Sequence, residues 1–184
     1  MGSKSKTKIM ESYKINKREA GTKLKKQKKL SNLDLSQNIN LIVLKCFDNP
    51  LENLNITQCV FLEELYSDGC HLITIDLSQN INLILLDLFD NNSSSLDVTQ
   101  NINLESFGCS SNELTHLDIR NGNNSNLVSF ASLDNPNLKC VFVNDSEFMD
   151  TTFGGNIDPN STFVETQAEC DALSIEEQIV ENFQ

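Results

Sequence analysis

The side chains that could do chemistry in this sequence are few and lie far apart. Its two histidines, His71 and His116, form neither a metal-binding pair nor a Cys/His dyad at a recognisable spacing. No glycine-rich phosphate-binding loop is present, and no two cysteines have the C-x₂-C spacing of zinc sites. We therefore expect no catalytic residues, no cofactor, no bound metal and no enzyme activity.

A recurring acidic position is the arrangement most easily taken for a calcium site. One carboxylate or amide stands at the same place in each repeat, at Asp34, Asn55, Asp76, Asp97 and Asp118. Calcium prefers about six to eight oxygen ligands, which single side chains about 4.8 Å apart do not supply. We interpret this column as solvent-exposed turn residues.

The elements that must position these side chains follow from a period of 21 residues. Five short apolar pairs begin at that step, three of them within nearly identical copies of "LDLSQNINL": Leu33, Leu54, Ile75, Leu96 and Leu117. Two further apolar residues follow in each unit, at Leu41 and Leu44, Leu62 and Leu65, Leu83 and Leu86, Leu104 and Phe107, Leu127 and Phe130. The unit L-x-x-L-x-(C/S/L)-x-x-N-x-L is the leucine-rich-repeat pattern, and its period is typical of a solenoid. The sequence predicts a short, right-handed, β-rich leucine-rich-repeat coil with parallel strands and few or no helices in the repeats.

Asparagines recur with the same period as the leucines. One column holds Asn49, Asn91, Asn112 and Asn135, with Cys70 in the second unit, and another holds Asn38, Asn80 and Asn101, with Cys59. Asparagine carries a donor and an acceptor on one short side chain, and the corners of a tight coil leave backbone groups that need partners. We interpret both columns as structural ladders. Cys46 and Cys109 stand at inward positions and are expected to pack as small apolar residues.

Charge divides the chain into a basic arm and an acidic body. The first 29 residues contain eleven basic and two acidic side chains, a net +9, whereas the other 155 contain three basic and 24 acidic ones, a net −21. An acidic body of this kind repels nucleic acid, so we expect no nucleic-acid partner. No apolar run approaches the roughly 18 residues of a membrane span, and we recognise no secretory signal.

At this point the repeats resemble the 21-residue leucine-rich repeats of secreted and surface proteins from Bacteroidetes-type bacteria, over about residues 30–170. "NPNLKCVFVND" from Asn135 is similar to that family's closing segment, and a cysteine follows 30 residues after Cys140. The resemblance implies a Cys140–Cys170 disulfide and a secreted or cell-surface location. "LSIEEQIVENF" from Leu173 resembles the linker before a C-terminal sorting domain, which we do not recognise here.

The expected organisation has four segments: a disordered basic arm (1–29), a solenoid of five repeats (30–139), a C-terminal cap (140–170) and an acidic linker or tail (171–184). In a leucine-rich-repeat fold, residues that alternate with the inward leucines of the main strand face outward on the concave side. In the first three coils these include three aromatic residues, flanked by apolar and acidic ones: Phe47, Tyr66 and Phe89; Val43 and Leu85; Glu64, Asp68 and Asp87. Exposed aromatic groups of this kind mark interaction sites.

We therefore expect a monomeric, non-catalytic binding or adhesion module that recognises a protein or glycan through this face. Two alternatives stay open from the sequence. The chain could be a structural spacer that carries a missing sorting or effector domain, or the non-catalytic part of a surface enzyme complex.

Overall fold

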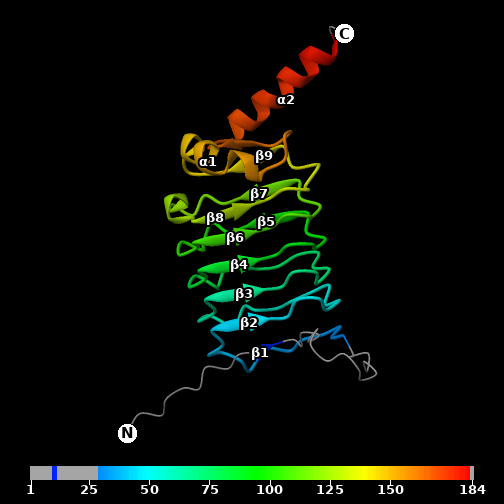
Figure 1. Cartoon of the computed structure of the whole chain (residues 1–184), viewed down its shortest axis with the longest axis vertical. Helices are drawn as coiled ribbons and strands as arrows, with labels where there is room; N and C mark the ends of the chain where they lie inside the picture. Colours follow the sequence, from blue (N-terminus) through cyan, green and yellow to red (C-terminus); the bar gives the residue numbers. More distant parts are fainter. Residues whose placement is uncertain (1–9, 12–28, 183–184) are drawn as a thin grey trace, which may run out of the picture.

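The computed structural model describes residues 10–11 and 29–182, which form a stack of coils along one long axis (Figure 1). On one side runs the main sheet, which is parallel and has the strand order β1 (Met10–Glu11), β2 (Val43–Lys45), β3 (Glu64–Tyr66), β4 (Leu85–Asp87), β6 (Ser106–Gly108) and β8 (Ser129–Ala131). The second sheet has the order β10 (Thr162–Val164), β9 (Cys140–Phe142), β7 (His116–Asp118) and β5 (Ser95–Asp97). The fold is a β-rich repeat solenoid with parallel strands, which confirms the prediction from the period.

Each main-sheet strand directs its middle residue into the core. Leu44, Leu65, Leu86, Phe107 and Phe130 pair in register from coil to coil, and each is at most 1% exposed. A fully buried side chain of this size contributes about 1.5–3 kcal/mol, but only when a neighbouring coil covers it. Stacking is therefore what makes a 21-residue coil stable.

One coil is longer than the others. The middle residues of β6 and β8 are 23 positions apart, and the intervening segment contains a 3₁₀ turn at Asn124–Asn126. Gly122 precedes this turn with a φ of 79°, a left-handed conformation that glycine adopts without a steric penalty. The two additional residues are accommodated at this corner, and the parallel pairing of β6 with β8 is retained.

The second sheet is less extensive than the sequence predicts. Apolar alternation indicates a short strand at the start of every repeat, but the earlier coils show only an isolated bridge between Asn53 and Thr74. Regular strands occur at β5 and β7, where β9 and β10 of the cap continue the ladder. The regular part of this sheet is the part that adjoins the cap, a non-local arrangement that a local pattern does not encode.

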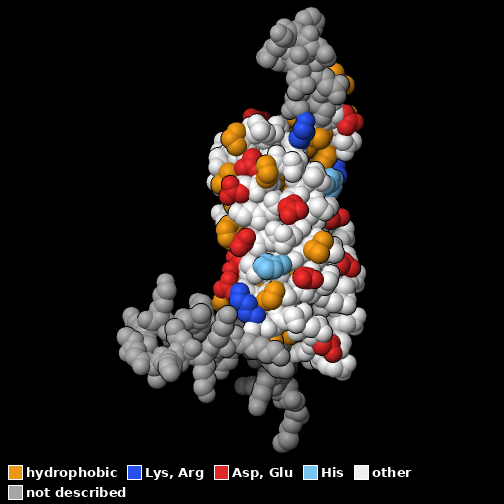
Figure 2. All heavy atoms as spheres, turned by 90° about the vertical axis from the view of Figure 1, so that its right-hand side faces the viewer, with side chains coloured by type: hydrophobic (Ala, Val, Ile, Leu, Met, Phe, Trp, Pro, Cys, Tyr) orange, Lys and Arg blue, Asp and Glu red, His pale blue; other side chains and the backbone are white. Residues whose placement is uncertain are grey.

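The stack is nearly straight in both views of the molecule (Figures 1 and 2). Where β5 and β7 lie opposite the main sheet, both sides of a coil carry strands at the same spacing of about 4.8 Å, so neither side lengthens relative to the other there. The face expected to be concave is therefore close to flat, a correction to the shape that the family resemblance implies.

The C-terminal cap closes the last coil. Helix α1 (Ser146–Phe153) begins after Asp145, whose carboxylate accepts a hydrogen bond from the Phe148 N–H, and the 3₁₀ turn Gly154–Asn156 follows it. Phe153 and Phe163 place their rings about 6 Å from that of Phe130, at 6.1 and 6.0 Å between centroids. These contacts cover the apolar end of the stack.

A disulfide joins Cys140 in β9 to Cys170, with 5.9 Å between their Cα atoms. Cys170 lies in helix α2 (Gln167–Asn182), which projects beyond the end of the stack (Figure 1). The expected disulfide is confirmed. The boundary expected between residues 170 and 171 falls inside this helix.

The N-terminal end of the main sheet is formed by part of the basic arm. Met10 pairs with Leu44 and Glu11 with Lys45, so β1 covers the edge of β2. These two residues of the arm expected to be disordered form a strand, because the first coil leaves a row of backbone groups that another strand can pair with. Most of the arm expected at 1–29 lies outside the described residues.

Candidate functional site

The outward-facing positions of the main sheet form one continuous surface, which we call the main-sheet face. In chain order, coil by coil, it consists of Val43, Lys45 and Phe47; Glu64, Tyr66 and Asp68; Leu85, Asp87 and Phe89; Ser106, Gly108 and Ser110; and Ser129, Ala131 and Leu133. The strand register aligns these positions between coils. The eight residues predicted from the sequence all lie in its first three coils.

Aromatic side chains on this face differ in what they contact. The Lys45 Nζ lies 4.6 Å from the centre of the Tyr66 ring, a cation–π arrangement, and the Tyr66 hydroxyl donates to Glu64 Oε2 at 3.1 Å. Burial raises the pKa of Tyr66, and the contact with Glu64 raises it further. Phe89 is 47% exposed, whereas Phe47 is half-buried. Phe89 is thus the most accessible aromatic ring on the face.

Carboxylates neighbour Phe89 on the same surface, Asp87 two residues earlier on its strand and Asp68 at the matching position of the preceding coil. Burial raises the pKa of Asp68, and the charges of Asp87, Asp48 and Asp90 add to this effect. Asp87 Oδ1 accepts the Phe89 N–H at 3.1 Å, which holds that carboxylate against the strand. Acidic side chains are also spread along the height of the stack on the side that Figure 2 shows. The face therefore favours cationic and hydrogen-bond-donating groups.

A left-handed turn follows each main strand, and in three coils an aspartate occupies it: Asp48, Asp90 and Asp134. Asp48, Gly69, Asp90, Ser111 and Asp134 occupy this place in successive coils, with φ between 53° and 61°. Aspartate tolerates this conformation better than most side chains do, because its short polar group can hydrogen-bond locally. At Gly69 a Cβ would lie 3.2 Å from Asp48 Oδ1, so glycine also relieves crowding there.

The first asparagine column forms the ladder that the sequence predicted. Asn91 is buried, and its Nδ2 donates to three carbonyl oxygens, those of Ser67 at 2.9 Å, Leu88 at 3.0 Å and Phe89 at 3.2 Å. Its Oδ1 accepts the backbone N–H groups of Leu72 at 2.8 Å and Cys70 at 3.2 Å. Asn112 and Asn135 repeat the pattern of donation one and two coils later. This column holds the end of each main strand, including the backbone of Phe89, in place.

The second asparagine column connects the coils through hydrogen bonds that its amide nitrogens donate. Asn80 donates to the carbonyls of Ile56 and Cys59, and Asn101 donates to those of Leu77 and Asn80. The Oδ1 atoms of Asn80 and Asn101 have no hydrogen-bond partner among the described residues. In the longer coil the buried residues Asn121 and Asn124 take over, with Asn121 donating to the Asn101 carbonyl. We did not predict these two, because the additional residues shift them out of the period.

The acidic column forms turns, as predicted. Asp34, Asn55, Asp76, Asp97 and Asp118 each accept the backbone N–H two residues later through Oδ1. These bonds to Ser36 and Ser78 lower the pKa values of Asp34 and Asp76. We expected every residue of this column to be exposed to solvent, but Asp118 is buried and forms an ion pair with Arg120.

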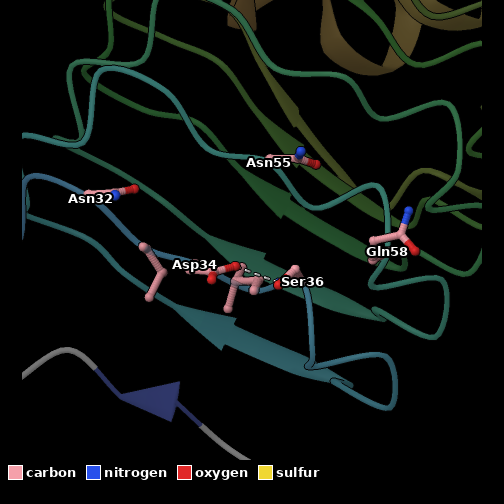
Figure 3. A pocket seen from close by; sticks show the side chains of 7 residues that line it. Asn32, Asp34, Ser36, Asn55 and Gln58 are labelled. Atoms are coloured by element: carbon pink, nitrogen blue, oxygen red, sulfur yellow. Dashed lines mark hydrogen bonds between the residues drawn. The ribbon is translucent and has the colours of Figure 1, made fainter.

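Two shallow hollows lie along the acidic column and not on the main-sheet face. One, of about 320 Å³, is lined by polar and apolar residues of the first two coils, namely Asn32, Leu33, Asp34, Leu35, Ser36, Asn55 and Gln58 (Figure 3). The other, of about 310 Å³, adjoins the next coil and includes Thr57 and Thr74. Figure 3 shows Asp34 bonded to Ser36, so this carboxylate is engaged in its own turn. Neither hollow gathers a set of convergent charged groups.

The four cysteines outside the disulfide are buried, as expected for Cys46 and Cys109. Burial raises the pKa of Cys59 and of Cys109. The Cys70 thiol donates to the Cys46 carbonyl at 3.0 Å, the Cys46 thiol donates to the Tyr66 carbonyl at 3.7 Å, and the two thiols lie against each other. This contact raises the pKa of Cys46 and lowers that of Cys70.

The histidines serve no common site. His71 lies in a turn with a φ of 58°, whereas His116 begins β7 and places its ring 5.3 Å from that of Phe142. The Arg120 guanidinium also lies over the Phe142 ring, 5.0 Å from its centroid, and it forms an ion pair with Asp118. Across residues 10–11 and 29–182 no cluster of three or more His, Cys, Asp or Glu side chains could hold a metal ion. The same part of the chain contains no helix long and apolar enough to cross a membrane.

Comparison with known proteins agrees with this architecture. No protein-family profile and no curated protein sequence matches the chain. Among solved structures, the functional domain of InlJ from Listeria monocytogenes, described as including a cysteine ladder, is similar with a TM-score of 0.50 and 22% identity. The match covers 72% of this chain but only 36% of that one. The chain has a leucine-rich-repeat-like fold.

Proposed function

We propose that the chain is a non-catalytic binding module and that the first three coils of the main-sheet face contact a protein or glycan ligand. The observation that carries this proposal is the exposure of Phe89 beside Asp68 and Asp87 on a sheet face. An aromatic ring exposed among polar neighbours contributes strongly to binding when a partner covers it.

Variation between coils supports the same face. Inward positions repeat as leucine or phenylalanine and corner positions repeat as asparagine, because the fold requires them. The outward row Val43, Glu64, Leu85, Ser106 and Ser129 instead changes its chemistry at almost every coil. Residues that the fold leaves free to vary are the ones available to specify a ligand.

The chemistry of the face suggests what such a ligand offers. Apolar groups can cover Phe89 and Leu85, while amide, hydroxyl or cationic groups can reach Asp68 and Asp87. Lys45 stacked on Tyr66 shows that this face accommodates a cation over an aromatic ring. Both a polypeptide and a glycan with polar substituents meet these requirements.

We further infer membership of the Bacteroidetes-type 21-residue repeat family and a secreted or cell-surface location. The Cys140–Cys170 disulfide supports this, because disulfides persist in oxidising compartments. The chain spans about a third of the length of the InlJ domain to which it is similar. Any role that this chain shares with that longer domain is therefore a proposal.

The test compares two exposed phenylalanines. Phe89→Ala removes the ring from the proposed site, and Phe61→Ala removes a ring of similar exposure, 54%, at a corner away from the main-sheet face. Immobilised wild type and variants are screened against extracellular polysaccharides and surface-protein extracts, and the affinity for any ligand found is measured. We expect Phe89→Ala to weaken binding by more than about 1 kcal/mol and Phe61→Ala to leave it unchanged.

A ligand whose affinity ignores Phe89 but falls with Asp76→Ala or Asp97→Ala would move the site to the acidic column. If the whole screen retains nothing on the wild type, the structural-spacer alternative becomes the better account.

A further inference from the structure

The second coil departs from the first asparagine column at Cys70. In the later coils the ladder amide reaches back to a carbonyl of the preceding coil, as Asn91 does to Ser67 and Asn112 to Leu88. Cys70 stands at this ladder position and makes the same contact, with its Sγ 3.0 Å from the Cys46 carbonyl oxygen. The thiol thus occupies the place of the amide that links neighbouring coils elsewhere.

The residue that Cys70 reaches is itself a cysteine. At the position of Cys46 the next two coils carry Ser67 and Leu88. The Cys46 and Cys70 side chains, which are 1% and 0% exposed, lie against each other: the Cys70 Sγ is 3.0 Å from the Cys46 carbonyl oxygen, and each thiol shifts the pKa of the other. At Cys109 the ladder contact is made by amides and not by a thiol, because Asn112 and Asn135 both donate to the Cys109 carbonyl oxygen. Cys46 and Cys70 are thus the free thiols in contact within the described part of the chain.

We propose that Cys46 and Cys70 form a second disulfide, which joins the first two coils when the protein meets an oxidant of the disulfide class. Cys70 thiolate attacks one sulfur of the oxidant and releases its other half as a thiol. Cys46 thiolate then attacks the Cys70 sulfur of this mixed disulfide and releases the second thiol. Two protons leave the protein, and two electrons reduce one disulfide to two thiols.

The order of attack agrees with the environment of the two sulfurs. Interaction with the neighbouring Cys46 lowers the pKa of Cys70, and the thiolate is the attacking species. Because both sulfurs are buried, exchange requires the first coil to separate locally from the second. On its outer edge the first coil pairs with the two-residue strand β1, a smaller contact than a full coil provides, so it opens more readily than a central coil.

The consequence is a covalent link at each end of the solenoid. Cys140–Cys170 closes the C-terminal cap, and Cys46–Cys70 would hold the first coil to the second. The first two coils also carry Lys45 and Tyr66, whose stacking spans the same junction. Oxidation would therefore keep this part of the main-sheet face aligned.

Mass spectrometry of the full chain tests the proposal directly. The protein is incubated with oxidised glutathione in a urea concentration below the unfolding transition, alkylated under full denaturation, and digested without reduction by a protease that cleaves after glutamate. Trypsin is unsuitable because no lysine or arginine lies between Cys46 and Cys109. Cleavage after Glu52, Glu63 and Glu105 separates Cys46, Cys59 and Cys70 onto different peptides.

We expect a cross-linked peptide pair containing Cys46 and Cys70 in the oxidised sample and two alkylated cysteines in a reduced one. Cys70→Asn, which introduces the residue found at this position in the other coils, removes the cross-link and leaves Cys46 alkylated. In a Cys140→Ser/Cys170→Ser background, oxidation should still raise the melting temperature by about 5 °C or more.

The proposal is overturned if both thiols are alkylated in a sample whose Cys140–Cys170 bond has formed. It is also overturned if Cys59 or Cys109 pairs with Cys46 as often as Cys70 does. The peptide measurement decides even if the serine background fails to fold.

Discussion

Replacing Asn91 with alanine should destabilise the protein more than any other single polar substitution in the central coils. The change removes five hydrogen bonds: three that its Nδ2 donates and two that its Oδ1 accepts. Each contributes about 0.5–1.5 kcal/mol net, and a buried backbone group left without a partner costs about 1–3 kcal/mol. Water reaches part of the vacated corner, so we expect a loss of about 3–5 kcal/mol.

Urea unfolding followed by circular dichroism measures this loss, since the chain has no tryptophan. Asn92→Ala is the matched control, because its side chain is exposed and makes one long contact with Glu113 Oε1 at 3.4 Å. The control should change stability by less than about 0.5 kcal/mol. Asn91→Cys, which copies Cys70, should fall between the two. A loss below about 1 kcal/mol for Asn91→Ala would show that the ladder does not hold the coils together.

Other perturbations probe the core, the cap and the charges. Leu65→Ala should cost about 2–5 kcal/mol in the same urea titration, whereas the outward-facing Glu64→Ala should cost about 0.5 kcal/mol or less; equal losses would refute the strand register. Reducing the disulfide that closes the cap should lower the melting temperature measured by calorimetry, and an unchanged value would show that the cap does not depend on it. Burial alone would raise the pKa of Asp118, but its contacts with Arg120 outweigh this and lower it. Because the folded-state pKa is depressed, the stabilisation is present above the unfolded-state value of about 3.9 and is lost as pH falls through the folded-state pKa. Asp118→Asn should therefore reduce stability at pH 7 and have little effect in acid; a constant difference across this range would contradict the assignment.

The sequence predicts most of the solenoid, because its period reports the fold directly. An inward leucine appears every 21 positions, at Leu44, Leu65 and Leu86, because consecutive coils superimpose. The observed strand register pairs these three residues. The asparagine columns were equally predictable, since a corner that recurs demands the same hydrogen bonds each time. The eight residues expected on one face do share it, although their role in binding stays a prediction.

Other features depend on contacts that no local pattern encodes. The pairing of Met10 with Leu44 joins segments of different composition, so charge alone suggested a free arm. The regular part of the second sheet adjoins the cap, and Asn121 and Asn124 lie beyond the insertion that interrupts the period. The contact between Cys46 and Cys70 was also missed, because each cysteine was assigned to a separate column.

The equal spacing of the coils has a consequence for how this molecule could change in length. Each coil bonds to the next in the same register, so a duplication of one complete unit would insert between neighbours without disturbing either ladder. Recombination between the nearly identical segments that begin at Leu33, Ile75 and Leu96 would produce such duplications or deletions. Every added unit would extend the stack by about 4.8 Å and present three further positions for selection to alter. The length of the molecule is thus a heritable variable that changes in whole steps.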